Sequence, residues 1–595
     1  MSLLPDLLQP VPDRARWGRP RHIEAGRAAE DGQFVEVGQI VEVGQATGAW
    51  ARRPTGSTRN RVPREPVEPR EPVGRRDTVR RVAAAVSVVT ALGVAAIAWS
   101  STLVGEYSVM DLGPAGAGHD AHAGHGPGAA GDPGAPGASV TGATPPQTSV
   151  TALTAPTGRP ADVHVELVAR QATIDVPGGH PVDGYTVNGR SPGPEIRASQ
   201  GDLVQVDFVN ASVSDGATLH WHGMDVPNAA DGVAGITQDV VPIGGRFSYR
   251  FIAQDAGTYW YHSHQVSHEQ VVGGLLGAVV IEPRADGVEM PEGGSDASGT
   301  THVGTAHDVT ALLHVYGGQY TLNGSVRDER VAAAPGEPVR VRVINSDQGT
   351  ASVWSVAPFT VLATDGHEVH APTPVTHQRL LIPAGGRADV SVQAPTDGVM
   401  RLHVGGARSV LVGDVSSTHA AETAPDEPQP DETLDLLSYG AAEPLGFDPS
   451  APDRSFDYVI ARRFGIIDGR PGNFWTINGR MFPDMPMFHV REGDVVVMHL
   501  RNDSGDVHPM HLHGHHVVVL ARDGAAASGS PWVVDSLDVH PGEQYDIAFV
   551  ADNPGIWSDH CHTLPHAVDG LVAHVMYDGI TTPFTINGAA GNSPE

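Results

Sequence analysis

The chain has 595 residues, a formal net charge of −31, 31 His and a single Cys. This length exceeds what one hydrophobic core can serve, so several domains are expected. A single Cys excludes an internal disulfide framework and any metal site built only from thiolates. The negative charge argues against nucleic acid as a partner. The 71 Gly and 48 Pro favour turn-rich, β-rich modules over a helical protein.

The N-terminal region differs from the rest of the chain in charge. Residues 1–81 contain 15 Arg and 11 acidic residues, whereas the remainder contains 23 Arg and 58 acidic residues. The uncharged apolar run 82–104 separates them and is long enough for a transmembrane helix, which needs about 20 residues. Arginines precede this run and none follows until Arg159, so the positive-inside rule predicts a cytoplasmic N-terminus.

We therefore expect a disordered cytoplasmic segment over 1–81 and a single-pass membrane anchor over 82–104. The rest of the chain is then extracytoplasmic, at the cell membrane. A cleaved export signal, which would release a secreted protein, is the alternative. Residues 105–160 are rich in Gly, Ala, Pro and Thr, a composition that predicts a flexible linker.

The remainder contains a threefold repeat. An aromatic-Thr-aliphatic-Asn-Gly phrase begins at Tyr185, Tyr320 and Trp475, and each copy is followed by a Gly-acid pair and then an Asn nine residues after that Gly. Short alternating strands fill the intervals, as in β-sandwiches. The repeat predicts an all-β fold of three homologous Greek-key sandwich domains, at 161–285, 300–415 and 430–582.

Histidine pairs occupy equivalent positions in the first and third domains. The pairs are His220 and His222, His262 and His264, His511 and His513, and His560 and His562. Residues i and i+2 of a strand point to one face, so each pair presents two imidazoles together. Eight imidazoles in two symmetric halves predict a metal cluster between these domains, and a ligand set without carboxylates suits copper. In the middle domain the first of these positions has no histidine pair, and the second has only an isolated His403.

A second ligand set lies in the third domain. His508, Cys561 and His566 supply two imidazoles and a thiolate, the set found in blue-copper electron-transfer sites. Because Cys561 alternates with His560 and His562, its side chain should point away from theirs. The thiolate can then bind one copper ion while its neighbours bind the cluster.

From about residue 161 to 577 the chain resembles the three-domain, laccase-like multicopper oxidases. The matching motifs are His220-Trp-His222-Gly, His262-Ser-His264, His508-Pro-Met-His511-Leu-His513-Gly and His560-Cys561-His562 followed by His566. The resemblance implies cupredoxin domains and about four copper ions. It assigns His508, Cys561 and His566 to a type 1 copper, and His220 and His511 to a type 2 copper. It assigns the other six paired histidines to a type 3 pair: His222, His262, His264, His513, His560 and His562.

The resemblance also implies residues that tune the chemistry. Leu571 takes the axial position of the type 1 site, where an apolar residue raises the copper potential. Asp231 corresponds to an acidic residue beside the type 2 copper and is expected to supply protons for dioxygen reduction. Some relatives carry an acid directly after the last type 1 histidine, where this chain has Ala567, so the nearby Asp569 is the second expected proton donor.

The expected activity is the one-electron oxidation of small reducing substrates, phenols or aromatic amines by default, coupled to reduction of dioxygen to water. A metal-ion oxidase acting on cuprous, ferrous or manganous ions is the alternative within enzymes. A copper-binding electron-transfer protein without oxidase activity is a less favoured alternative, because it would need only His508, Cys561 and His566.

Overall fold

The computed structural model describes residues 102–112, 147–284, 307–415 and 428–594, with single positions between 80 and 100. Apart from Arg80, the segment predicted to be disordered, 1–81, lies outside the described residues, as does part of the predicted anchor, 82–104. Among the residues that are described, no helix is long and apolar enough to cross a bilayer. The anchor and the extracytoplasmic location stay predictions.

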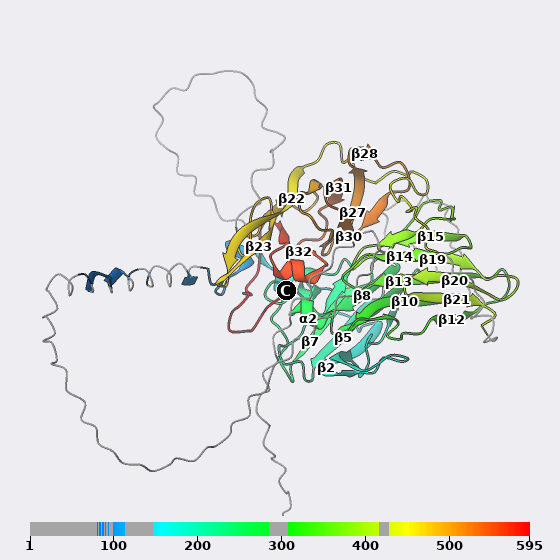
Figure 1. Ribbon diagram of the computed structural model, residues 1–595, viewed down its shortest axis with the longest axis horizontal. Helices are drawn as coiled ribbons and strands as arrows, with labels where there is room; N and C mark the ends of the chain where they lie inside the picture. The colour runs from blue at the N-terminus through cyan, green and yellow to red at the C-terminus, as the bar shows by residue number, and fades with distance from the viewer. Residues whose placement is uncertain are drawn as a thin grey trace, which may run out of the picture. The chain divides into compact units, whose positions relative to one another are not determined.

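Three two-sheet sandwiches follow one another along the chain (Figure 1). The first has sheets β3-β2-β5-β7 and β4-β9-β8-β6. The second has β11-β10-β13-β19-β15-β16 and β12-β21-β20-β14-β18. The third has β23-β22-β25-β31-β27-β28 and β24-β33-β32-β26-β30. Corresponding strands keep the same order in all three, so the sequence repeat is a repeat of topology.

The strands of the three sandwiches form three consecutive runs along the chain. The first domain comprises β2 (Val163–Ile174), β3 (Val182–Val187), β4 (Ile196–Ser199), β5 (Leu203–Asn210), β6 (His220–His222), β7 (Arg246–Ile252), β8 (Gly257–His262), the short helix α2 (Ser267–Gln270) and β9 (Leu276–Glu282). The second comprises β10 (His307–Tyr316), β11 (Gln319–Leu322), β12 (Glu329–Ala332), β13 (Pro338–Asn345), β14 (Ala351–Trp354), β15 (Phe359–Thr364), β16 (His367–Glu368), β17 (Pro374–Val375), β18 (Leu380–Ile382), β19 (Arg387–Gln393), β20 (Val399–Val404) and β21 (Arg408–Gly413). The third comprises β22 (Arg454–Ile467), β23 (Arg470–Ile477), β24 (Met487–Val490), β25 (Val495–Asn502), β26 (His508–Leu512), β27 (Val517–Arg522), β28 (Ala525–Ala526), β29 (Trp532–Val534), β30 (Ser536–Val539), β31 (Gln544–Val550), β32 (Ile556–Cys561), α4 (Leu564–Val568) and β33 (Val572–Tyr577).

The repeated Asn-Gly phrase marks the same turn in each domain. Asn188, Asn323 and Asn478 have φ of 53°, 50° and 53°, and the glycine after each also has a positive φ. Two successive residues in this left-handed region favour Asn-Gly, because Gly lacks a Cβ and the Asn side chain tolerates the conformation. The sequence repeat therefore reflects a turn that few other residue pairs could form.

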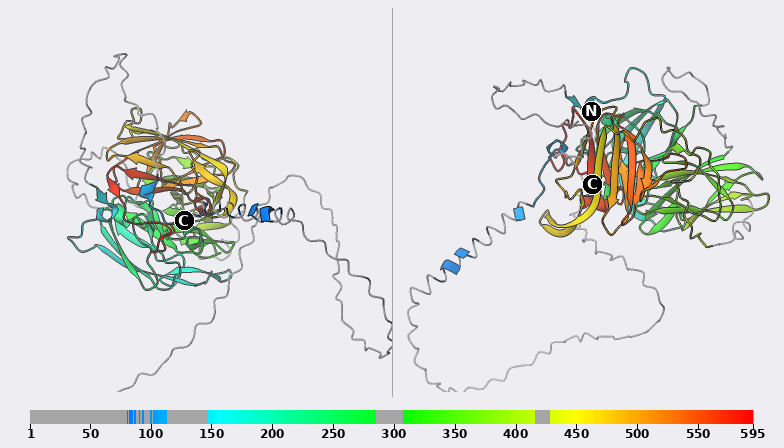
Figure 2. Two further views of the ribbon diagram at one scale, coloured as in Figure 1. Left: turned by 90° about the vertical axis from the view of Figure 1, so that its left-hand side faces the viewer. Right: turned by 90° about the horizontal axis from the view of Figure 1, so that it is seen from above.

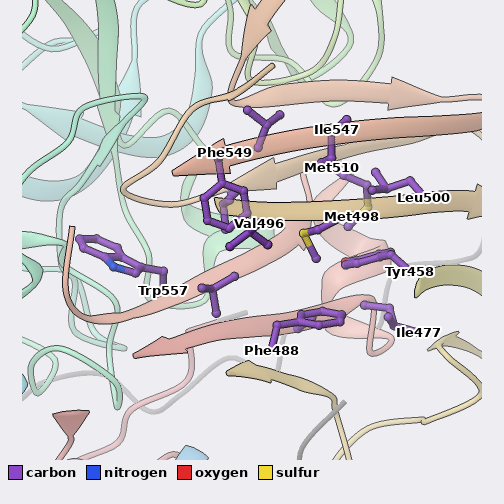
Figure 3. Close-up of a cluster of buried hydrophobic side chains, with 14 of the residues drawn as sticks. Tyr458, Ile477, Phe488, Val496, Met498, Leu500, Met510, Ile547, Phe549 and Trp557 are labelled. Carbon is purple, nitrogen blue, oxygen red and sulfur yellow. The ribbon is translucent and has the colours of Figure 1, made fainter. Parts of the chain in front are cut away.

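Apolar side chains between the two sheets of each sandwich form its core. In the third domain, Phe488, Val496 and Phe549 are almost fully buried and project from strands of both sheets (Figure 3). Cys561 belongs to this core and is 0% exposed. Its side chain therefore lies on the inner face of the sheet, opposite to the neighbouring histidines.

The prediction of a flexible linker over 105–160 is wrong at both ends. Val109, in the 3-10 helix Val109–Asp111, and Val150, in the 3-10 helix Val150–Ala152, are fully buried against the core of the third domain. Strand β1 (Thr148–Ser149) pairs in parallel with β34 (Ile580–Thr581) near the C-terminus. Burial of these two apolar side chains holds both ends of the segment on the third domain, although the surrounding composition is typical of a flexible linker. The residues between, 113–146, lie outside the described part.

Candidate metal centre

The histidine pairs lie on matching strands of the first and third domains. In the first, β6 pairs with β8 so that His220 is opposite His262; in the third, β26 pairs with β32 so that His511 is opposite His560. At the corresponding strands of the middle domain Trp354 is opposite His403, and their rings stack at 3.8 Å. The middle domain therefore has an aromatic contact where the others have histidine pairs.

All eight paired imidazoles meet between the first and third domains. The Nε2 atoms of His220 and His511 are 3.5 Å apart. Three sets of three histidines have ligand atoms within 4.8 Å of one another: His220, His222 and His511; His222, His262 and His562; and His264, His513 and His560. The assignment of these histidines to a type 2 copper and a type 3 pair stays what the resemblance implies. Every set contains histidines from both domains.

The protonation of these imidazoles suits metal binding. Burial lowers the pKa of His511 to about 4, and it lowers the pKa of five others well below the ordinary value. Those five are His222, His262, His264, His513 and His562. Neutral imidazoles offer the lone pairs that metals require. Buried ring nitrogens of His222, His262 and His562 have no hydrogen-bond partner among the described residues, as expected for atoms that face a metal ion.

The thiolate set is separate and lies in the third domain alone. Cys561 Sγ is 3.7 Å from His508 Nδ1 and 3.6 Å from His566 Nδ1, and these two Nδ1 atoms are 3.2 Å apart. Burial lowers the pKa of His508 to about 3 and that of His566 to about 4. Leu571 is fully buried, and its backbone bonds to both His566 and Cys561. Two neutral imidazoles, one sulfur and an apolar neighbour fit a blue-copper site.

Asp231 lies beside two of the cluster histidines, and its role as a proton donor stays a prediction. Its carboxylate oxygen Oδ1 accepts hydrogen bonds from His220 Nδ1 at 3.0 Å and from His513 Nδ1 at 3.1 Å. Its side chain is fully buried, and this burial raises the pKa of the carboxyl group. Asp231 therefore orients one histidine from each domain.

Asp569 is the second residue expected to supply protons, and this role stays a prediction. It is exposed at the C-terminal end of α4, where it lines a pocket of about 170 Å³ with Phe482 and His574. In the described part of the chain it forms no hydrogen bond with any predicted copper ligand.

Several residues of the site were missed from the sequence. Asp535, at the start of β30, is buried and contacts His222. Arg387 of the middle domain pairs with Asp535. Trp475 of β23 lies 4.5 Å from the His508 ring and 4.6 Å from the His566 ring. The sequence does not single out Asp535, because the stretch 532–539 also contains Ser536 and Asp538.

The comparisons with known proteins agree with the geometry. Sequence models of the multicopper oxidase family match residues 169–286 and 459–579. Multicopper oxidase MmcO of Mycobacterium tuberculosis is 31% identical over 460 residues, which cover 70% of this chain and 87% of that protein. Laccase-1 of Botryotinia fuckeliana is 28% identical over 438 residues, covering 64% and 76%. A solved multi-copper oxidase from Pseudomonas thermotolerans gives a TM-score of 0.54 at 27% identity, covering 70% of this chain and 100% of that one. The chain thus has a cupredoxin-like, nearly all-β fold and belongs to the multicopper oxidases, oxidoreductases that use dioxygen as electron acceptor.

Proposed function

We propose that this chain is a laccase-like oxidase that takes single electrons from phenols or aromatic amines and reduces dioxygen to water. The observation that carries the proposal is the joint presence of the eight-histidine cluster and the separate thiolate set. About four copper ions would fill them, and when bound they supply the one-electron redox chemistry and the binding of dioxygen. The residues around the thiolate set decide which substrate can reach the type 1 copper.

The substrate side of the thiolate set is defined by its two imidazoles. His508 is fully buried, and its Nε2 atom is 2.8 Å from Ser504 Oγ. His566, at the first turn of α4, is partly exposed. A substrate can therefore reach His566 and not His508. We therefore expect electrons from the substrate to enter the type 1 site at the exposed edge of its ligand His566.

The hairpin of β22 and β23 borders this edge and projects from the third domain (Figure 2). The Arg462 guanidinium lies 3.7 Å over the Trp475 ring and is 2.8 Å from Asp506. Two residues along the same strand, Phe464 is 71% exposed. Arg462 offsets the negative charge of Asp506 beside His566, so this edge attracts cations less than Asp506 alone would. Exposed aromatic surface suits aromatic substrates. These observations favour organic substrates over metal ions.

Replacing Arg462 with glutamine tests this charge argument. We expect phenol oxidation to fall a few-fold and cuprous-ion oxidation to rise, because Asp506 would lose the cation that offsets its negative charge. Oxygen uptake measured with a substituted phenol and with cuprous ion would give the ratio. Arg501→Gln is the matched control, since Arg501 is an exposed arginine paired with Asp503 elsewhere on the third domain. An unchanged ratio would count against Arg462 as a selector.

The activity itself is tested with a substrate panel on the copper-loaded protein. Faster oxygen uptake with phenols than with cuprous, ferrous or manganous ions is the expected outcome. The reverse order would make the chain a metal-ion oxidase. A copper content of about one ion per chain instead of about four, with no oxygen uptake, would identify an electron-transfer protein.

Replacing Leu571 with methionine probes the axial position. A thioether that approaches the copper stabilises its oxidised form, so the reduction potential of the blue site should fall. Leu and Met have similar volumes, and the swap should cost less than about 1.5 kcal/mol of stability. A potentiometric titration followed at the blue absorption measures the shift. An unchanged or raised potential would show that Leu571 does not occupy the axial position.

A further inference from the structure

The middle domain contributes no histidine pair, yet one of its turns lies against the cluster. The turn 383–386 joins β18 to β19. Gly385 has φ +84°, and a Cβ at this residue would lie 2.7 Å from His222 Cε1. Its carbonyl accepts a hydrogen bond from Trp260 Nε1 at 3.1 Å. Trp260 in turn packs on the His262 ring at 4.4 Å. This turn is therefore a wall of the histidine cluster.

Arg387, the first residue after that turn, joins all three domains. Its side chain is fully buried. Two of its nitrogens donate to the two carboxylate oxygens of Asp535 in the third domain, at 2.6 and 2.5 Å. Its Nε donates to the carbonyl of Thr258 at 3.1 Å, on the strand β8 that carries His262. A forked pair of this kind fixes the plane of a carboxylate as well as its position.

Asp535, held by Arg387, is in turn hydrogen-bonded to two predicted copper ligands. Its Oδ1 accepts from His222 Nε2 at 3.1 Å, and its main-chain carbonyl accepts from His511 Nδ1 at 2.9 Å. Asp365 of the middle domain accepts from the backbone N–H groups of Asp535 and Ser536, at 3.1 and 3.2 Å. The middle domain thus holds both the side chain and the backbone of Asp535.

We propose that Arg387 is a positioning residue of the oxygen-reducing centre. Through Asp535 it orients one type 2 ligand, His511, and one type 3 ligand, His222. The orientation of a metal-binding imidazole is set by the group that its other nitrogen contacts. The inference rests on the proposed function, because it needs copper in the histidine cluster. It gives the middle domain, which has no histidine pair, a direct role in that cluster.

The test compares Arg387→Gln with Arg342→Gln in the full chain. Arg342 is a matched control: its side chain is also nearly buried and pairs with Asp308 and Asp389, and it contacts Thr258 of the first domain but none of the cluster histidines. Each change removes one buried cation from a group of carboxylates, so both should lower the melting temperature. Arg387→Gln alone should also lose the near-ultraviolet type 3 absorption and alter the type 2 EPR spectrum. Its blue colour should remain, and its oxygen uptake should fall about 10- to 100-fold.

Arg387→Lys keeps the test usable if Arg387→Gln fails to fold. A lysine retains the positive charge but cannot hold both oxygens of Asp535, so partial loss of the type 2 and type 3 signals is expected. Unchanged signals and full copper content in a folded Arg387 variant would overturn the inference, as would equal losses in Arg342→Gln. A wild-type protein that lacks these signals when copper-loaded would instead refute the proposed function. The two failures are therefore distinguishable.

Discussion

Replacing Cys561 with serine is expected to abolish the blue colour and reduce oxygen uptake with phenols to background. The thiolate is the only sulfur ligand of the set, with His508 and His566 Nδ1 atoms at 3.7 and 3.6 Å. A hydroxyl remains protonated at neutral pH and binds copper weakly, so the first copper ion would be lost. Cys561 also links the type 3 ligands His560 and His562 through the backbone, so the electron path to the cluster begins at this sulfur.

The cluster should survive this substitution, because its eight histidines are all retained. Copper analysis should show a loss of about one ion, with the type 2 EPR signal kept. Met510→Leu is the matched control: Met510 lies opposite Cys561 across β26 and β32, and the swap changes packing beside the sulfur without changing a ligand. A Cys561→Ser protein that stays blue would show that the set is not a type 1 site.

The second large effect is expected from Asp231→Ala. This buried carboxylate holds His220 and His513 and has no exposed surface. Its removal frees a ligand in each domain and deletes the acid nearest to the type 2 position. Reoxidation of the reduced enzyme by dioxygen should slow about 10- to 100-fold. Reduction of the blue site by a phenol should be unaffected, because Asp231 does not contact Cys561, His508 or His566.

Stopped-flow absorption at the blue band separates the two half-reactions. Asp231→Asn is the informative companion, because an amide keeps the shape and one hydrogen-bond acceptor but cannot release or take up a proton. If Asp231 only orients His220 and His513, the Asn variant should reoxidise far faster than the Ala variant. If it also transfers protons, both should be slow. Unchanged turnover in both variants would refute the assignment.

The sequence was sufficient for the grouping of ligands, and particular residues show why. Strand periodicity places His560 and His562 on one face and Cys561 on the other, and the structure has the sulfur in the core of the third domain. The repeat aligned His220 with His511 through Asn210 and Asn502. Both inferences use only local geometry, which a sequence preserves.

Contacts between residues far apart in the sequence could not be predicted in this way. Arg387 and Asp535 are 148 residues apart, and nothing local to either residue marks the other as its partner. Asp569 was assigned from the resemblance and from its nearness in sequence to His566, and its role as a proton donor stays a prediction. The burial of Val109 and Val150 could not be predicted from the flexible composition around them. Burial of a single side chain depends on a cavity formed by strands that are distant in the sequence.

The two carboxylates of the cluster have a thermodynamic consequence. Asp231 holds His220 of the first domain and His513 of the third, and Asp535 contacts His222 of the first and His511 of the third. No complete set of cluster ligands exists within one domain. Copper affinity and the docking of these domains must then be linked: whatever free energy the metal gains from the assembled site is added to the interface. The stability of the interface between the first and third domains should therefore rise with the availability of copper.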